Sequence, residues 1–187
     1  MGPIRLKLHP LSFLQPSNLQ ADRIYAQLVR SVQPAAGGTA WDLYCGVGLV
    51  AFHLASRFRK IYGIDVEPRT LELATLNASL NGVTNAEFRI GRVEALLQDR
   101  RFWLQEAKPD VVVVDPPRPG LHPGALSAVL SARPRMIAYL SCNPQSLVRD
   151  LTALRSGFPR YRLTEVYPFD MFPQTNHLET LVILERT

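Results

Sequence analysis

Residues 110–117 of the 187-residue chain read Asp110-Val111-Val112-Val113-Val114-Asp115-Pro116-Pro117. Four consecutive β-branched apolar residues between polar ones are typical of a strand buried on both faces of a parallel sheet. The two prolines cannot extend the hydrogen-bond ladder, so they form a rigid corner directly after the strand. We therefore expect a buried strand over residues 110–115, with Asp115 facing a ligand site at its carboxyl end.

Strand-like apolar runs alternate with helical patterns along most of the chain, which favours an α/β fold with a mainly parallel sheet. The predicted helices span residues 17–31, 49–58, 68–81, 93–107, 124–131 and 145–154. The predicted strands span residues 39–44, 60–65, 86–90, 110–115, 136–141, 162–168 and 178–185. The last connection is too short for a crossover helix, so the final two strands are expected to pair antiparallel. We interpret residues 1–187 as a single domain, with an N-terminal segment and helix over 1–38 and the sheet core over 39–187.

The composition is that of a soluble globular protein, with 47% hydrophobic and 20% charged residues. No apolar run approaches the roughly 20 residues of a membrane helix, and the first eight residues do not form a secretory signal. The two cysteines, Cys45 and Cys142, make neither a disulfide framework nor a four-ligand metal site. We therefore expect a cytoplasmic protein without a bound metal or a membrane partner.

The net charge of +5 favours a polyanionic partner such as nucleic acid. The basic residues form small groups that are scattered along the chain: Arg57–Arg59–Lys60, Arg100–Arg101, Arg133–Arg135 and Arg160–Arg162. Each group taken by itself is more typical of a solvated face than of a binding site.

In open α/β sheets, ligands bind at the carboxyl ends of the parallel strands, beside the point where the strand order reverses. Four predicted strand ends carry polar or reactive residues: Tyr44-Cys45-Gly46, Asp65, Asp115 and Ser141-Cys142-Asn143. If the last strand runs antiparallel, its start near Glu179 lies at the same rim.

The turn over residues 42–48 follows a strand and opens a helix, and Gly46 and Gly48 would let its backbone approach a ligand. Asp65, at the end of the second strand, could accept hydrogen bonds from both ribose hydroxyls of NAD or of S-adenosylmethionine. Its alternative role is a helix cap. The corner after Asp115 favours S-adenosylmethionine over NAD, because it resembles the Asp-Pro-Pro corner of many base methyltransferases. Amino-group methylators usually continue with an aromatic residue, whereas Arg118 follows here.

Three segments resemble the signature segments of the RNA uracil-5 methyltransferase family. They are Asp115-Pro116-Pro117-Arg118-x-Gly120, Ser141-Cys142-Asn143-Pro144 and Asp170-Met171-Phe172-Pro173-Gln174-Thr175-x-His177-x-Glu179. Ser12-Phe13-Leu14-Gln15 resembles the Phe-x-Gln segment of that family. The resemblance covers about residues 10–186. It implies a Rossmann-like class I methyltransferase fold, in which a mainly parallel seven-stranded sheet ends in an antiparallel β-hairpin and carries helices on both faces.

The resemblance also implies an activity, the transfer of a methyl group from S-adenosylmethionine to carbon 5 of a uridine in RNA. The cofactor-contacting positions are Gln15, Tyr44, Asp65 and Asp115, beside the Gly46 turn, while Cys142 matches the nucleophile and Glu179 the general base. The Asp-Met-Phe-Pro form looks closer to ribosomal-RNA members than to transfer-RNA ones. We therefore expect a monomer that acts on RNA, and on rRNA rather than tRNA.

Some positions depart from the family pattern. Leu49 stands where many members have Asn, and Ser17 replaces a frequent Asn. Gly91-Arg92 stands where the family often has Gly-Asp near the adenine, and Glu94 could substitute for the missing Asp. The N-terminal RNA-binding module and the central region that usually precede the catalytic domain are not in this chain. These departures bear on the affinity for the cofactor more than on the type of reaction.

The chemistry explains why a cysteine and a carboxylate are needed. Carbon 5 of uracil becomes nucleophilic when a thiolate adds to carbon 6, and a base must later remove the carbon-5 proton. A helix beginning near Gln145 would favour a Cys142 thiolate, although a free cysteine can also be buried and inert. The alternative is that Glu179 is an exposed strand residue, and the hydrophobic periodicity by itself favours this alternative.

Three further residues are candidates for contacts with the substrate. Arg118 could hold a uracil carbonyl or a phosphate. His177 is a second candidate base, or a satisfied loop histidine. Phe172 belongs to an apolar loop, with Phe169, Met171 and Pro173, that could support a flipped base or pack into the core.

Other functions remain open at this point. An amino-group nucleic-acid methyltransferase would use the Asp-Pro-Pro corner without Cys142. A non-catalytic domain would bind S-adenosylmethionine or RNA without turnover. A nicotinamide-binding domain is a more distant alternative.

Overall fold

The computed structural model describes residues 4–10, 12–34, 37–99, 103, 107–171, 173–175 and 178–187. Its helices are α1 (Asn18–Ser31), α2 (Leu49–Leu54), α3 (Pro68–Leu80), α4 (Val93–Leu96), α5 (Pro123–Ala132) and α6 (Pro144–Ser156). Its strands are β1 (Thr39–Leu43), β2 (Lys60–Asp65), β3 (Ala86–Ile90), β4 (Val111–Val114), β5 (Met136–Ser141), β6 (Tyr161–Phe169) and β7 (Glu179–Arg186). The element types and most of the boundaries agree with the sequence-based predictions.

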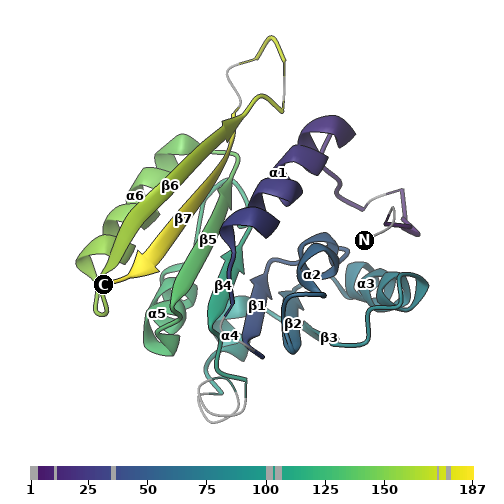
Figure 1. Ribbon diagram of the computed structural model, residues 1–187, viewed down its shortest axis with the longest axis horizontal. Coiled ribbons are helices and arrows are strands. Elements are labelled where there is room, and N and C mark those ends of the chain that lie inside the picture. Colours follow the sequence, from purple (N-terminus) through teal and green to yellow (C-terminus); the bar gives the residue numbers. More distant parts are fainter. Residues whose placement is uncertain are drawn as a thin grey trace.

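The seven strands form one sheet in the order β3-β2-β1-β4-β5-β7-β6 (Figure 1). The first five strands pair in parallel, and β7 pairs antiparallel with both β5 and β6. The order reverses between β1 and β4, so the crevice outside their carboxyl ends is the expected ligand site. The predicted antiparallel end of the sheet is confirmed.

The two faces of the sheet are covered by different helices. Successive side chains of a strand point to opposite faces, so Val112 and Val114 pack with residues of α4, α5 and α6, whereas Val111 and Val113 pack with residues of α1 and α2. All four β4 valines are buried. The valine run is therefore the central, doubly covered strand that the sequence predicted.

Local sequence signals set several helix ends. The Ser17 hydroxyl accepts a hydrogen bond from the Gln20 amide and caps α1. Asn143 caps α6 in the same way by accepting from the Gln145 amide. None of the helices in the described part of the chain is long and apolar enough to cross a bilayer.

Two predicted helices are shorter than expected. The prediction extended one helix to residue 58, but α2 ends at Leu54. The helix predicted over residues 93–107 ends at Leu96, where the Asp99 amide bonds to the Leu96 carbonyl in a tight turn. The buried indole of Trp103 packs edge-on against Trp41, with ring centroids 5.3 Å apart. The Trp103 amide donates to the Asp99 carbonyl at 3.0 Å, while residues 100–102 and 104–106 of the predicted helix lie outside the described residues.

Candidate active site

The carboxyl ends of the central strands bring several predicted site residues together. A cavity of about 60 Å³ is lined by Gln15 from the N-terminal segment, by Tyr44 and Gly46 from the turn after β1, and by Asp115 from the end of β4. A larger hollow of about 570 Å³ adjoins it and also contains Gln15. Four of the five predicted cofactor-contacting residues therefore share one cavity.

The fifth residue, Asp65, lies at the edge of this group. Its carboxylate accepts a hydrogen bond from the Gly46 amide at 2.9 Å and one from the Glu67 amide at 3.1 Å. Glu67, not Asp65, is the N-cap of α3, so the cap alternative for Asp65 is wrong. Each carboxylate oxygen accepts more than one hydrogen bond, so Asp65 keeps capacity for a ligand.

The turn between β1 and α2 is shaped for a close approach. Gly46 has a φ of +52°, and a Cβ added there would meet no atom within 4 Å. Tyr44 adopts a φ of +65°, which is uncommon for a residue with a side chain. Backbone in such a conformation is concentrated at functional sites, where the surrounding structure holds it.

Asp42 and Tyr25 also line the cavity, and neither was among the predicted site residues. Asp42 is 1% exposed, its Oδ2 accepts from the Ala51 amide at 3.2 Å, and no partner of its Oδ1 is found among the described residues. Burial, followed by the nearby Asp115, raises the pKa of Asp42 to about 8. Tyr25 of α1 stacks on His53 at 4.5 Å, and burial, then Asp115, raises its pKa. A carboxylate in an otherwise buried strand was the signal that could have identified Asp42.

Cys142 lies in a turn that joins β5 to α6. The Ser141 hydroxyl accepts from the Asn143 amide at 3.1 Å, and the Asn143 side chain donates to the Arg118 carbonyl at 3.0 Å. The thiol is half-buried, in contrast to the buried Cys45. Cys142 is therefore not sealed inside the core.

Glu179 begins β7 beside this turn. In the antiparallel ladder Ser141 pairs with Thr180, so Cys142 and Glu179 occupy the next step at the end of the two strands. Glu179 is 2% exposed, and its Oε1 has no hydrogen-bond partner among the described residues. The exposed position that periodicity favoured is wrong, because β7 lies inside the sheet between β5 and β6.

The charges around Cys142 oppose one another. Burial, then the Glu179 and Asp115 carboxylates, raise the pKa of the thiol, while the Arg118 guanidinium lowers it. The helix α6 begins at Pro144, close to the predicted start near Gln145. The net result differs from the expected thiolate, since the thiol favours its protonated form.

Replacing Arg118 by glutamine is expected to raise the pKa of the Cys142 thiol further, because it removes the cation that stabilises the thiolate. Alkylation by iodoacetamide between pH 7 and 10 measures this pKa, because only the thiolate reacts. Arg118→Lys is the matched control and should stay near the wild-type pKa. An unchanged pKa in the glutamine variant would show that Arg118 does not act on this thiol.

A buried network holds the loop that carries Arg118. The Asp150 carboxylate, 3% exposed, accepts from the Tyr139 hydroxyl and from the Leu121 amide, both at 2.7 Å. Arg149 donates both to Asp150 and to the Pro119 carbonyl. These contacts fix both ends of the segment from Pro119 to Leu121, and with it the position of Arg118.

Glu179, like Asp42, has a strongly raised pKa. Burial, followed by Asp115, raises its pKa from 4.5 to about 8. Because the folded-state pKa lies above the unfolded one, the unfolded chain ionises first as the pH rises. Folding stability from this group is therefore complete below pH 4.5 and is lost progressively up to about pH 8.

The variant Glu179→Gln is consequently expected to be more stable than the wild type at neutral pH. At about 1.4 kcal/mol per pKa unit, the gain is of order 3 kcal/mol at pH 7 and vanishes near pH 4.5. Urea denaturation of both proteins at several pH values measures the difference. A difference that stays constant with pH would contradict the raised pKa of Glu179.

The apolar loop before β7 is divided between two environments. Met171 is 2% exposed and packs in the core with α1, so the core alternative is correct for this residue. Phe169 is half-buried against the same cluster, and Pro173 is exposed. The predicted substrate contacts Phe172 and His177 lie outside the described residues.

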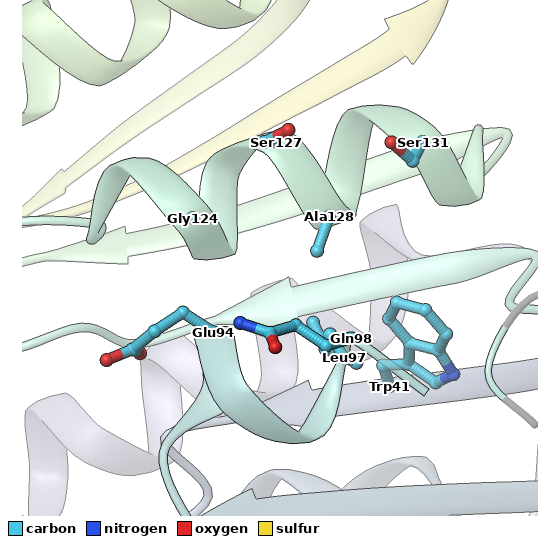
Figure 2. Close-up of a pocket in the computed structure, with 8 residues that line it drawn as sticks. All are labelled: Trp41, Glu94, Leu97, Gln98, Gly124, Ser127, Ala128 and Ser131. Atoms are coloured by element: carbon cyan, nitrogen blue, oxygen red, sulfur yellow. The ribbon is translucent and has the colours of Figure 1, made fainter. Parts of the chain in front are cut away.

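Another hollow of about 240 Å³ lies away from this rim, between α4 and α5. Figure 2 shows Ala128 of α5 pointing toward the α4 side chains, with Trp41 at one end and Glu94 at the other. Glu94 is paired with Arg92. Glu94, which the sequence offered as an acidic residue near the adenine, lines this hollow, but the other predicted catalytic and cofactor-contacting residues do not, so we assign the chemistry to the rim.

The chain is similar in sequence to a known protein family. The family model described as tRNA (uracil-5-)-methyltransferase matches residues 4–187. The chain belongs to this family. Relatives of this uracil-5-methyltransferase chain include uncharacterized RNA methyltransferases of Bacillus cereus, 36% identical over all of the chain, and of Gloeobacter violaceus, 41% identical over 98% of it. The chain spans 40% and 38% of the lengths of these two relatives.

A solved structure of the tRNA (uracil-54, C5)-methyltransferase of Pyrococcus abyssi, in complex with S-adenosyl-L-homocysteine, superposes with a TM-score of 0.80. It is 33% identical and covers 95% of this chain, which covers 41% of that one. Trm5b of the same organism shares the fold with a TM-score of 0.73 at 18% identity. The class I methyltransferase fold is thus established for this member of a family whose cofactor is S-adenosylmethionine.

The residues at the rim fit this cofactor. Asp65 offers acceptor capacity for ribose hydroxyls, the Gly46 turn leaves open space beside its backbone, and the Tyr44 ring lines the same cavity. Unpaired oxygens of Asp42 and Glu179 point to polar groups that complete the site.

Proposed function

We propose that this chain methylates carbon 5 of a uridine in RNA through a covalent adduct with Cys142. The observation that carries the proposal is the adjacency of a half-buried thiol and a buried carboxylate at the ends of β5 and β7, beside the Asp115 cavity. Covalent addition to a pyrimidine requires a nucleophile and a base at one place, and this rim supplies both.

The cofactor is bound by the β1–β2 side of the rim. Asp65 accepts the ribose hydroxyls, Tyr44 and Gln15 enclose the ligand, and the backbone around Gly46 approaches it closely. When bound, S-adenosylmethionine supplies a methyl group on a positively charged sulfur. Asp115 lines this pocket and its carboxylate also acts on the Cys142 thiol, so it would face both the cofactor and the base.

Cys142 carries out the first step. Its thiol loses a proton to solvent, which Arg118 favours, and the thiolate forms a bond to carbon 6 of the uracil. The electrons of the carbon 5–carbon 6 double bond move toward the carbon-4 oxygen, and carbon 5 becomes nucleophilic. The new carbon–carbon bond forms as the bond between the methyl group and sulfur breaks.

Glu179 then completes the reaction. Its carboxylate removes the proton from carbon 5, the double bond reforms, and the bond from carbon 6 to the Cys142 sulfur breaks. The pKa of about 8 makes Glu179 a stronger base than an ordinary glutamate, and a base is most effective when its pKa lies near the working pH. The overall products are 5-methyluridine, S-adenosylhomocysteine and one proton.

Asp65→Asn is expected to weaken S-adenosylmethionine binding by about 10- to 100-fold, because a ribose hydroxyl loses a charged acceptor. The amide oxygen can still accept from Gly46, so the turn should keep its shape. Calorimetric titration measures the change. Glu67→Gln, next to the same turn but outside the cavity, is the control, and equal affinities for the two variants would contradict the assignment of Asp65.

Release of tritium from RNA labelled at carbon 5 of uridine tests the reaction itself. Methylation at carbon 5 displaces one labelled proton into water for each methyl group incorporated. Incorporation of methyl groups without tritium release would identify another position, such as an amino group, and would refute the proposal.

We further propose that the RNA is ribosomal, on the basis of the Asp170-Met171-Phe172-Pro173 segment. Incubation with unmodified rRNA and unmodified tRNA, followed by mass mapping of methyluridine, distinguishes the two. Methylation confined to rRNA is expected, and methylation confined to tRNA would refute this part.

A further inference from the structure

The edge of the sheet opposite the active-site rim gathers two of the basic groups that are separate in the sequence. We call it the basic edge and define it by five arginines: Arg133, Arg135, Arg160, Arg162 and Arg186. They lie where β5 and β6 begin and where β7 ends, at the end of the sheet away from the β6–β7 connection (Figure 1).

Backbone pairing holds these residues side by side. The Arg186 amide donates to the Arg135 carbonyl at 2.9 Å, and the Thr187 amide donates to the Arg160 carbonyl at 3.1 Å. The Arg186 guanidinium donates to the Arg133 carbonyl. The backbone hydrogen bonds at the antiparallel end of the sheet therefore set the relative positions of these arginines.

An exposed aromatic ring lies within the basic edge. Phe158, in the connection from α6 to β6, is 81% exposed, and the Arg133 guanidinium lies 5.3 Å from the centre of its ring. An apolar ring so exposed gains nothing from the core. A ring and a stacked guanidinium form a platform on which an unpaired base can stack.

Arg133 occupies a conformation that does not suit an arginine. It caps α5 with a φ of +52°, in the left-handed region where glycine is usual. This conformation places the Arg133 guanidinium over the Phe158 ring.

Few carboxylates offset these charges. Glu185 lies 3.8 Å from Arg162, with both side chains largely in solvent. The Asp110 carboxylate, next to the Arg135 backbone, accepts from the Thr39 amide. The side chains of Arg133, Arg135 and Arg160 have no carboxylate partner among the described residues, which leaves three guanidinium groups for an external anion.

We infer that the basic edge binds a single-stranded stretch of RNA, with its phosphates on the arginines and an unpaired base on Phe158. The inference rests on the proposed action on RNA. The six residues of β5 separate this edge from the rim by about 20 Å, so the bound stretch is distinct from the uridine in the active site.

The test compares two triple variants of the full chain. The edge variant carries Arg133→Gly, Arg135→Gln and Arg160→Gln, where glycine also relieves the left-handed position. The control variant carries Lys7→Gln, Arg23→Gln and Arg69→Gln, which remove the same charge from the N-terminal segment, α1 and α3. Thermal unfolding and S-adenosylmethionine binding verify that both variants are folded.

The probes are oligouridines of about 40 and about 8 nucleotides, with affinity measured by fluorescence anisotropy over a range of salt. We expect the edge variant to bind the longer probe about ten-fold or more weakly than the control variant at 0.1 M salt. The slope of log K against log salt should fall by about 2, or about 0.7 for each lost phosphate contact. Phe158→Ala alone should weaken binding by about ten-fold with an unchanged slope.

Equal affinities and slopes for the edge and control variants would overturn the inference and leave the basic edge to a partner other than RNA. A larger loss in the control variant than in the edge variant, for either probe, would overturn it too, because it would place the RNA on the N-terminal segment, α1 and α3. Failure of the proposed methylation would appear instead as absent tritium release by the wild type, whatever these affinities are.

Discussion

Cys142→Ala is expected to lower methylation of RNA by at least about 10⁴-fold while leaving the affinity for S-adenosylmethionine within a factor of about three. Without the Cys142 thiolate, carbon 5 of uracil stays a poor nucleophile, because Cys45, the other thiol of the chain, is buried. The Cys142 thiol is half-buried at a turn and is not part of the core, so the fold should tolerate alanine. Tritium release and calorimetry measure the two quantities.

Cys45→Ala is the matched control for covalent chemistry. Cys45 is the other cysteine, it is buried, and burial raises its pKa well above the usual value. This variant should still form a covalent complex with RNA, whatever its effect on the cofactor loop. Measurable turnover by Cys142→Ala would contradict the covalent mechanism and would favour an amino-group methyltransferase that uses Asp115 alone.

Glu179→Gln is expected to arrest the reaction after the methyl group has been transferred. Glutamine cannot accept the carbon-5 proton, so the double bond does not reform and the Cys142 sulfur is not released. Turnover should fall by about 10²- to 10⁴-fold. A covalent protein–RNA complex should accumulate with ordinary RNA and S-adenosylmethionine, up to one per enzyme, as a band resistant to denaturing gel electrophoresis.

Two features separate this arrest from simple damage to the fold. The variant should be more stable than the wild type at neutral pH, as the raised pKa of Glu179 requires. The accumulated complex should also carry a methyl group from labelled S-adenosylmethionine. Accumulation without the label would mean that Glu179 acts before methyl transfer, and normal turnover would assign the proton transfer to another group.

Much of the fold follows from local patterns. The valine run of β4 was identified as a buried strand because it lacks polar positions, and the structure covers it on both faces. The antiparallel end was predicted from the short connection between the last two strands. The rim that collects Tyr44, Asp115 and Cys142 followed from the rule that parallel strands end at a common edge.

Other features depend on contacts between distant segments, which no local pattern encodes. Glu179 alternates with apolar residues and looks exposed, but β7 is inserted between β5 and β6, and this position buries its carboxylate. The high pKa of Asp42 arises from Asp115 on a neighbouring strand in addition to burial. The predicted helix over residues 93–107 is described only in part, as α4 and Trp103, because residues 100–102 and 104–106 lie outside the described residues.

The basic edge illustrates the same limit. Arg133–Arg135 and Arg160–Arg162 are small groups when they are considered one at a time. The pairing of β7 with both β5 and β6 brings them together with Arg186. Their joint charge is a property of the sheet topology and not of any one segment.

The most direct test of the account is a mass measurement on the protein after incubation with S-adenosylmethionine and RNA that contains 5-fluorouridine. Fluorine at carbon 5 cannot leave as a proton, so the reaction should stop at the adduct. After digestion, we expect a methylated fluorouridine nucleotide attached to the peptide that contains Cys142, and to no other peptide. An intact enzyme that binds the cofactor and methylates ordinary RNA, yet leaves the Cys142 peptide unmodified, would contradict the account.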